Sequence, residues 1–400
     1  MKASLARAGT AVLAAAALLL PLNAATSAAA HTVDGAQAAG SGGGGLRAVL
    51  AQPPELERAH HDEASAGPSD GGGVAAQAIT CPKGRYDFDR TESCSNYDTT
   101  INYYLNGTWR GKADLHVETT VKLDPRNRYT STYTAAMTLT NPPPTVPEAL
   151  ASTATVSINC NTCVATSNPG PRALIPGTRQ SFEMAVSSPG RSLVSEGVVL
   201  QGTIKTPRHT DSTANLGPVF RPRCDSTARV TDARTGGCVY PQFTPTWQLN
   251  VRDNDVAAVA WHVDWAQRNL NHPWGVKGKG YPLHRTFDQA LQRENRREAC
   301  VRGVPRPPNS GGQSCDEYPM AQTHEGASKN SDYSCHFLNA RQNSKEGSLR
   351  KSYLNSQRVL EWDAFWVGVV KPVGAKAPAQ YRTGGAGALG PVGCGQDLNP

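Results

Sequence analysis

Short runs of β-branched and aromatic residues, separated by Pro, Gly and Asn, recur along the chain from Cys81 to Trp265. Runs of this kind, bounded by turn-forming residues, are typical of β-strands. The clearest predicted strands are Val117 to Leu123, Tyr129 to Leu139, Thr153 to Ile158, Phe182 to Val186 and Val198 to Ile204. Repeated short strands without long helical patterns predict a β-rich, sandwich-like domain over residues 79–268.

The last part of this region shows a strict alternation. Polar or small residues separate a row of four apolar side chains, namely Val259, Trp261, Val263 and Trp265. This alternation predicts a further, half-buried strand. The tyrosines and tryptophans of the region either form a polymer-binding face or are ordinary sheet residues, and the second interpretation is favoured because such rings are enriched in strands.

Beyond Trp274 the pattern becomes helical. Thr286 followed by Gln289 fits a capping box and predicts a helix that runs to about Ala299. Alternating apolar positions from Ala364 to Val370 predict a closing strand. The region 269–370 is therefore predicted to be a small mixed α/β domain, and the whole chain to be of the α+β class.

Both ends of the chain differ from these regions in composition. An apolar run from Ala11 to Leu20 follows basic residues and precedes small ones, which is typical of a signal peptide over residues 1–30. The segment 31–78 is rich in Gly, Ala, Ser and Pro and is predicted to be a flexible linker or propeptide, whereas 371–400 is a Gly- and Pro-rich tail. We expect no membrane anchor after cleavage, because the apolar run is shorter than the roughly 20 residues that a spanning helix needs.

The chain has ten cysteines. In an exported protein an even number favours disulfides, although spacing does not determine their connectivity. Pairing in sequential order joins Cys81 with Cys94, Cys160 with Cys163, Cys224 with Cys238, Cys300 with Cys315, and Cys335 with Cys394. A zinc site is the alternative for Cys160 and Cys163, but no second Cys or His pair of matching spacing follows.

The formal net charge of +7 is a moderate excess of basic residues. It is compatible with a polyanionic partner, and equally with a secreted protein that its charge keeps soluble. Any contact with nucleic acid must therefore come from local clusters of basic side chains.

The densest group of chemically useful residues lies near the C-terminal end. It reads Cys315-Asp316-Glu317-Tyr318-Pro319-Met320-Ala321, followed by Gln322-Thr323-His324-Glu325-Gly326-Ala327. Three carboxylates in an otherwise basic protein, with a proline that fixes the backbone beside two of them, suit a bound cation. Oxygen ligands of this type are preferred by Mg²⁺, Mn²⁺ and Ca²⁺.

This stretch resembles the motif of the NucA/NucB family of secreted bacterial deoxyribonucleases, in which Asp-Glu-aromatic-Pro-(Met or Phe)-Ala precedes Glu-Gly-(Gly or Ala). The resemblance covers about residues 275–370. It includes an Arg-rich helix at Asn295 to Cys300, and Asn343 with a turn containing Gly347 downstream. The first two thirds of the chain are not explained by it.

The resemblance implies DNA as the substrate and a divalent metal ion, Mg²⁺ or Mn²⁺, as the cofactor. The implied catalytic residues are Asp316, Glu317, Glu325 and Asn343, with Asp316 and Glu325 as metal ligands. Because successive side chains diverge in a strand or a helix, Glu317 is expected to support the site as a base, an orienting group or an ion-pair partner of Arg296 or Arg297. The basic residues expected to bind phosphates are Arg296, Arg297, Arg341, Lys345, Arg350 and Lys351.

Three nearby residues have competing interpretations. Asn343 is expected to position water or phosphate on the strength of the resemblance, whereas a lone Asn in such a polar stretch is by default a turn residue. His284 is a better candidate for a general base than His324, which lies inside the motif and is expected only to support the site. A surface or capping role is the alternative for His284.

The leading interpretation is a secreted, extracellular, metal-dependent and sequence-nonspecific deoxyribonuclease that acts as a monomer. One alternative is a nuclease toxin of interbacterial competition, with an immunity or inhibitor protein as its partner. Another is a non-catalytic extracellular DNA-binding protein.

Overall fold

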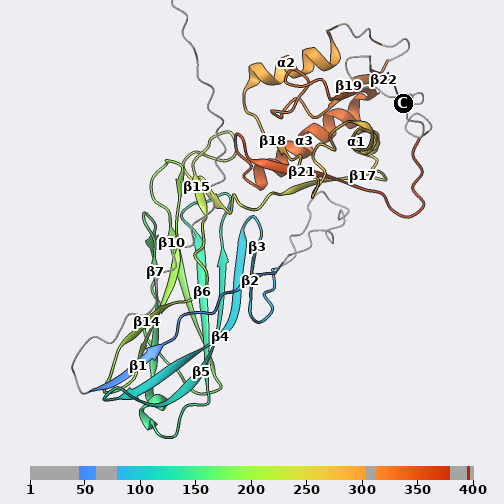
Figure 1. Ribbon diagram of the computed structural model, residues 1–400. Coiled ribbons are helices and arrows are strands. Elements are labelled where there is room, and N and C mark those ends of the chain that lie inside the picture. Colours follow the sequence, from blue (N-terminus) through green and yellow to red (C-terminus); the bar gives the residue numbers. More distant parts are fainter. Residues whose placement is uncertain (1–44, 60–78, 303–305, 307–310, 379–393, 397–400) are drawn as a thin grey trace, which may run out of the picture. The chain divides into compact units, whose positions relative to one another are not determined.

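The computed structural model describes residues 45–59, 79–302, 306, 311–378 and 394–396. Within these residues a β-rich region precedes a C-terminal region that contains three α-helices and further strands, as the predicted α+β class requires (Figure 1). The predicted signal peptide, residues 1–30, lies outside the described residues. In the part of the chain that is described, no helix is long and apolar enough to cross a membrane.

The β-rich region is built on a sheet of nine strands. Its long antiparallel strands are β4 (Glu92–Leu105), β5 (Thr108–Lys122), β6 (Ser131–Thr140) and β10 (Arg179–Ser187). Its shorter strands are β1 (Leu46–Leu50), β2 (Glu57–Arg58), β3 (Arg85–Phe88), β8 (Val164–Ala165) and β13 (His209–Thr210). The segment 46–50 was predicted to be part of a linker, but backbone pairing with both β4 and β13 makes it a strand of this sheet.

A smaller sheet completes a sandwich with the first. It has the order β14-β12-β7-β9, with β7 (Thr153–Asn159), β9 (Arg172–Ala173), β12 (Val199–Lys205) and β14 (Ser212–Asn215). Inward-facing residues of both sheets, such as Leu115 and Leu200, belong to one hydrophobic core. Tyr97, Tyr103 and Tyr133 are buried in this core, so they are sheet residues and not a binding face.

Three short strands and a 3-10 helix, η2 (Pro147–Ala151), complete the β-rich region. The strands β11 (Val194–Ser195), β15 (Arg223–Asp225) and β16 (Gly237–Val239) form a separate sheet. The loop between β15 and β16 contains Arg229.

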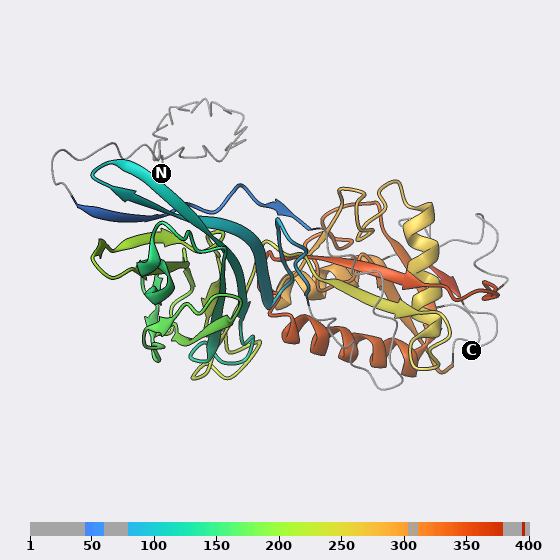
Figure 2. The ribbon, with the colours of Figure 1, turned by 90° about the horizontal axis from the view of Figure 1, so that it is seen from below.

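The C-terminal region has two three-stranded sheets and the helices α1 (Ala257–Asn269), α2 (Gln289–Cys300) and α3 (Ala340–Ser356) (Figure 2). One sheet places β21 (Ala364–Val370) between β17 (Thr246–Asn250) and β18 (Leu283–His284). The other places β20 (Ser334–Asn339) between β19 (Gln313–Tyr318) and β22 (Gly395–Gln396). β17 and α1 share a core with β21 although they precede residue 269, so packing groups them with the C-terminal region.

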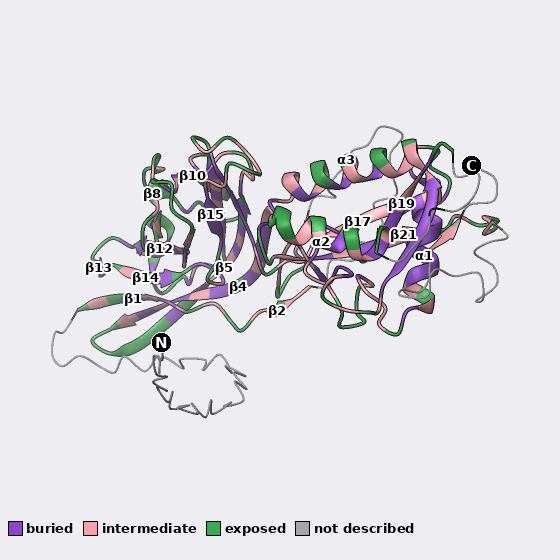
Figure 3. Cartoon of the chain, turned by 90° about the horizontal axis from the view of Figure 1, so that it is seen from above, coloured by how far each residue is buried: buried purple, intermediate pink, exposed green. Residues whose placement is uncertain are grey.

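Helix α1 occupies the place of the strand predicted from the alternation at Val259 to Trp265, and that prediction is wrong. Every position from Val259 to Ala266 is buried, including the polar residues His262 and Asp264 (Figure 3). A helix that is buried on all sides has no polar stripe of its own. Its apolar residues can therefore alternate as those of a strand do.

Buried arginines connect the β-rich region to the segment after α3. The Arg358 guanidinium, which is fully buried, donates to the Asp225 carboxylate from Nε at 2.7 Å and from Nη2 at 2.5 Å. Arg223 donates twice to Asp363, at 2.6 and 2.8 Å, and Arg90 donates to the same carboxylate at 2.8 Å. These pairs hold the end of α3 and the start of β21 against the sandwich.

Candidate active site

The strands β19 and β20 form a hairpin, and helix α3 follows it in the chain. Side chains of β19 and α3 line one pocket of about 550 Å³. Asp316 and Glu317 from β19 line it, together with Asn343 and Arg350 from α3 and Arg296 from α2. We call this the acidic pocket. Five of the sequence-predicted site residues thus come together.

Asp316 points toward a buried histidine that the sequence did not single out. Its Oδ2 lies 2.7 Å from Nδ1 of His262 in α1, and Nε2 of the same ring lies 2.8 Å from Oγ of Ser334 in β20. Burial raises the pKa of the Asp316 carboxyl to about 8, and the charge of Glu346 adds to this effect. Arg350 opposes the shift. The contact with His262 holds Asp316 in one orientation.

Glu317 faces a different element, as alternation along a strand requires. Its Oε1 lies 3.8 Å from Nε of Arg296, and it accepts a hydrogen bond from the backbone N–H of Ala321 at 3.3 Å. Burial and the neighbouring Asp316 raise the pKa of Glu317 to about 7, against the charges of Arg296 and Arg350. Of the roles considered for Glu317, the ion pair with Arg296 is present in the structure.

Arg350 is a buried cation beside both carboxylates. Its Nε donates to Glu346 Oε1 at 2.9 Å, and Glu346 also accepts from Trp247 Nε1 at 3.0 Å. The second nitrogen Nη1 lies 3.3 Å from Oε1 of Gln322. Burial by itself lowers the pKa of Arg350, but Glu346, Asp316 and Glu317 raise it above its ordinary value, so Arg350 remains charged at the wall of the acidic pocket.

Asn343 lies in the first turns of α3 and not in a loop, and Gly347 is likewise helical and not in a turn. The helix begins after Asn339, whose side chain accepts from the backbone N–H of Gln342. Nδ2 of Asn343 donates to Ser314 Oγ and to the Cys315 carbonyl, both at 3.0 Å. These bonds fix the carboxamide against β19 and hence the direction of its oxygen.

Glu325 does not line the acidic pocket. Its carboxylate accepts from the backbone N–H of His284 at 2.8 Å, and its Oε1 lies 2.6 Å from Nδ1 of the same residue. The hydrogen bond with Glu325 raises the pKa of His284. His324 pairs with Glu361 at 2.8 Å instead. The structure thus brings together Glu325 with His284, and Asp316 with His262, as two separate pairs.

The other predicted phosphate-binding residues lie elsewhere. Arg297 pairs with Glu294 on the surface of α2. Arg341 Nη1 donates to Asp255 at 2.7 Å, and Lys345 lies 3.9 Å from the same carboxylate. Lys351 lines a neighbouring pocket. Only Arg296 and Arg350 of the predicted set reach the acidic pocket.

All five predicted disulfides are present. They join Cys81 with Cys94, Cys160 with Cys163, Cys224 with Cys238, Cys300 with Cys315, and Cys335 with Cys394. The disulfide between Cys160 and Cys163 removes the thiolates that a zinc site would need. Cys300 and Cys315 fasten α2 to β19 at the edge of the acidic pocket.

The donor set of the acidic pocket fits a hard cation. The oxygen donors are the carboxylates of Asp316 and Glu317 and the amide of Asn343, while the sulfurs of Cys300 and Cys315 are bonded to each other. Among the described residues, no group of three or more His, Cys, Asp or Glu side chains is arranged to hold a metal ion. Carboxylate and amide oxygens are the ligands that hard divalent cations prefer.

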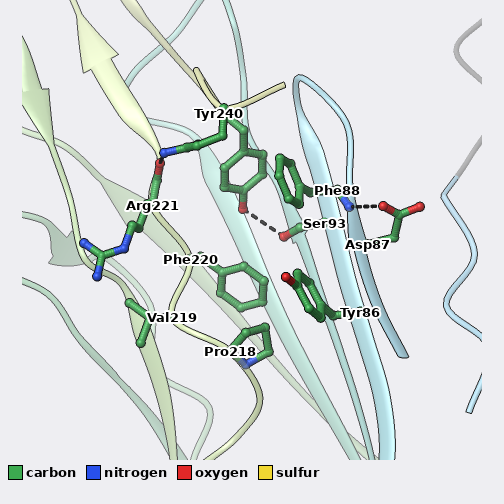
Figure 4. Close-up of a pocket in the computed structure, with 10 residues that line it drawn as sticks. Tyr86, Asp87, Phe88, Ser93, Pro218, Val219, Phe220, Arg221 and Tyr240 are labelled. Carbon is green, nitrogen blue, oxygen red and sulfur yellow. Dashed lines mark hydrogen bonds between the residues drawn. The ribbon is translucent and has the colours of Figure 1, made fainter. Parts of the chain in front are cut away.

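A second pocket, in the β-rich region, has a different character (Figure 4). Its walls are largely aromatic and aliphatic, and include Tyr86, Phe88, Phe220 and Tyr240. Tyr240 Oη lies 2.8 Å from Oγ of Ser93, and Asp87 accepts from the backbone N–H of Phe88, also at 2.8 Å. None of the predicted site residues lines this pocket.

Comparison with known proteins supports a nuclease. The C-terminal region is similar to a family of deoxyribonucleases, and every residue of the acidic pocket lies within the matched segment. The family is described as deoxyribonuclease NucA/NucB, and its model matches residues 275–367, which confirms the resemblance seen in the sequence. No curated protein and no solved structure matches the chain.

Proposed function

We propose that the protein is a secreted, divalent-metal-dependent deoxyribonuclease that hydrolyses DNA without sequence preference. The observation that carries this proposal is the convergence of Asp316, Glu317 and Asn343 on one pocket with Arg296 and Arg350, inside the segment that matches the nuclease family. Five disulfides support export, because they persist in oxidising compartments.

Each residue of the acidic pocket has a role that follows from its contacts. Asp316, with the amide oxygen of Asn343, would hold the cation, and His262 keeps the Asp316 carboxylate in place. When bound, the cation offsets phosphate charge and polarises a water molecule. Glu317, next to Asp316 in β19 and paired with Arg296, would take up and return a proton. Arg296 and Arg350 attract the phosphate, a contact that carries no sequence information.

A plasmid-cleavage assay tests the proposal. Oxidised protein should cut DNA with Mg²⁺ or Mn²⁺ and stop with EDTA. Asp316→Asn and Glu317→Gln should lower cleavage by about a hundredfold or more, as expected for groups that handle the cation or a proton. The matched control Glu294→Gln changes a surface carboxylate of α2 and should leave the rate unchanged.

The variant Glu325→Gln tests whether Glu325 is a metal ligand or only a partner of His284. We expect it to retain most cleavage, because Glu325 contacts His284 and not the acidic pocket. A loss equal to that of Asp316→Asn would return Glu325 to the set of metal ligands. Binding of DNA without cleavage, insensitive to EDTA, would instead indicate a non-catalytic DNA-binding protein and refute the proposal.

A further inference from the structure

A second polar pocket adjoins the acidic pocket. It has a volume of about 310 Å³ and shares one wall residue, Gln322, with its neighbour. We call it the basic pocket. Its polar lining consists mainly of three cationic residues and three glutamines, namely Arg229, Arg285, Lys351, Gln289, Gln292 and Gln322. No carboxylate is among its described lining residues, although the Glu361 carboxylate accepts hydrogen bonds from the Thr286 hydroxyl and the Phe287 backbone N–H behind the lining.

Arg285 is a buried cation in this pocket without a carboxylate partner at ion-pair distance among the described residues. Nη1 donates to the Val359 carbonyl and Nη2 to Asn355 Oδ1, both at 2.7 Å. The guanidinium carbon lies 4.5 Å from the centre of the Phe287 ring. Burial, and the like charge of Arg350, lower the pKa of Arg285 to about 10, against the charges of Asp363 and Glu361. A bound anion would further offset the cost of burying this cation.

Arg229 reaches the basic pocket from outside the nuclease domain. It lies in the β15–β16 loop of the β-rich region, whereas the family match begins at residue 275. Its Nη1 donates to the Phe287 carbonyl, and its guanidinium carbon lies 5.7 Å from the Phe287 ring. The exposed side chain is therefore anchored beside the pocket by a hydrogen bond and a ring contact.

We propose that the basic pocket binds a phosphate of the DNA strand next to the one cleaved in the acidic pocket, and that Arg229 makes the β-rich region part of the substrate-binding surface. This inference rests on the proposed function. Because the two pockets share Gln322, a strand with one phosphate in the acidic pocket can place a following phosphate in the basic pocket. Glutamine side chains and arginines are common partners of DNA phosphates and sugars.

Charge reversal of the two exposed cations tests the inference. Arg229→Glu and Lys351→Glu should each raise KM for duplex DNA about tenfold with kcat unchanged, and reduce the slope of log binding constant against log salt by about 1. The matched control is Arg234→Glu, in the same β15–β16 loop, whose side chain is 83% exposed and does not line the pocket. Thymidine 5′-(p-nitrophenyl phosphate) has one phosphate, so all three variants should cleave it at the wild-type rate.

The outcomes distinguish this inference from the proposed function. If Arg229→Glu and Lys351→Glu have the same KM for duplex DNA as Arg234→Glu, the basic pocket does not contact DNA and the inference fails. It also fails if both variants lose cleavage of the single-phosphate substrate, since the acidic pocket is then disturbed. If the wild-type protein cleaves neither substrate, the proposed function fails. The inference is then tested by fluorescence anisotropy, which measures the binding of labelled duplex DNA to the same three variants in EDTA.

Discussion

His262 Nδ1 and Asp316 Oδ2 lie 2.7 Å apart in the interior of the C-terminal region, although 54 positions separate the two residues in the chain. The histidine is fully buried, so it cannot touch DNA. Its second nitrogen contacts Ser334 on the neighbouring strand β20. The ring thus connects α1 with both strands of the hairpin and determines where the Asp316 carboxylate points.

We predict that His262→Phe lowers kcat for DNA cleavage about 10- to 100-fold, the usual cost of removing a group that orients a metal ligand. KM should change little, because the ring is remote from the substrate. His262→Gln, which keeps a hydrogen-bonding group, should recover part of the rate. The control is His272→Phe, which removes a comparable pair with Asp332 (2.9 Å) outside the acidic pocket. Equal rates for His262→Phe and His272→Phe would contradict the prediction.

Gly326 is required by the close approach of a buried side chain. A Cβ atom there would collide with the carboxamide of Asn295. That carboxamide donates to the carbonyls of Ala321 at 3.0 Å and Thr323 at 3.1 Å. The Asn295 carboxamide therefore holds the turn that connects Asp316 and Glu317 to Glu325. We predict that Gly326→Ala lowers the free energy of unfolding by about 1–3 kcal/mol, as overpacking of a core does.

Gly347 provides the matched comparison for Gly326. It lies inside α3 with open space around its Cα, and Gly347→Ala should raise the free energy of unfolding by up to about 1 kcal/mol through helix propensity. Denaturant titration of both variants measures the difference. A Gly326→Ala protein as stable as Gly347→Ala would show that the Asn295 contact is unimportant.

The buried pair of Arg358 and Asp225 should dominate the attachment of the two regions. Removing one partner leaves an uncompensated buried charge, so Arg358→Ala is expected to cost about 3–5 kcal/mol of unfolding free energy. Arg341 and Asp255 form the same kind of pair in an exposed setting, with side chains 64% and 44% exposed. Arg341→Ala should therefore cost less than about 1 kcal/mol. Similar losses for the two variants in urea unfolding would refute this contrast.

Low pH should weaken the attachment of the two regions, because it protonates Asp363. Burial by itself raises the pKa of this carboxyl, but hydrogen bonds and charge from Arg223, and the charge of Arg90, lower it below its ordinary value of 3.8. A carboxyl whose folded pKa is depressed stabilises the protein above its unfolded pKa, and this stability is lost as the pH falls toward the folded pKa. Wild-type stability should therefore decline below about pH 4.

The variant Asp363→Asn tests this dependence. It should be less stable than the wild type at neutral pH, because Arg223 and Arg90 lose their charged partner. Its free energy of unfolding should also decline less steeply as the pH falls, since an Asn side chain cannot take up the proton that Asp363 takes up. Parallel stability profiles from pH 7 to pH 3 would exclude Asp363 as the responsible group.

The sequence predicted the parts of the site that are contiguous in the chain. Asp316 and Glu317 form one motif, and the resemblance added Asn343 and Arg296, all of which line the acidic pocket. The sequence could not indicate His262, because only the packing of α1 brings that ring to β19. Glu325 was grouped with Asp316 because both belong to the motif that resembles the nuclease family, whereas the turn after Tyr318 directs Glu325 to His284.

The fold was predictable where one face of a segment is exposed to solvent and the other is buried. The five predicted strands of the sandwich correspond to β5, β6, β7, β10 and β12, and Ala364–Val370 is a strand as predicted. The helix expected from Thr286 is present as α2, but Asp288 is its cap, accepting from the backbone N–H groups of Ala290 and Leu291. α3 escaped prediction because Asn, Ser and Gly in its sequence are poor helix formers, so its helical state depends on tertiary packing.

The strand β22 has a consequence for the order of assembly. It pairs with β20, and its neighbour Cys394 is bonded to Cys335 across 59 positions of chain. Every residue of the acidic pocket is therefore synthesised before the strand that completes its sheet, and the fastening bond forms only where thiols are oxidised. The sheet that carries Asp316 and Glu317 is therefore completed only after the last residues of the chain are made and Cys335 and Cys394 are oxidised.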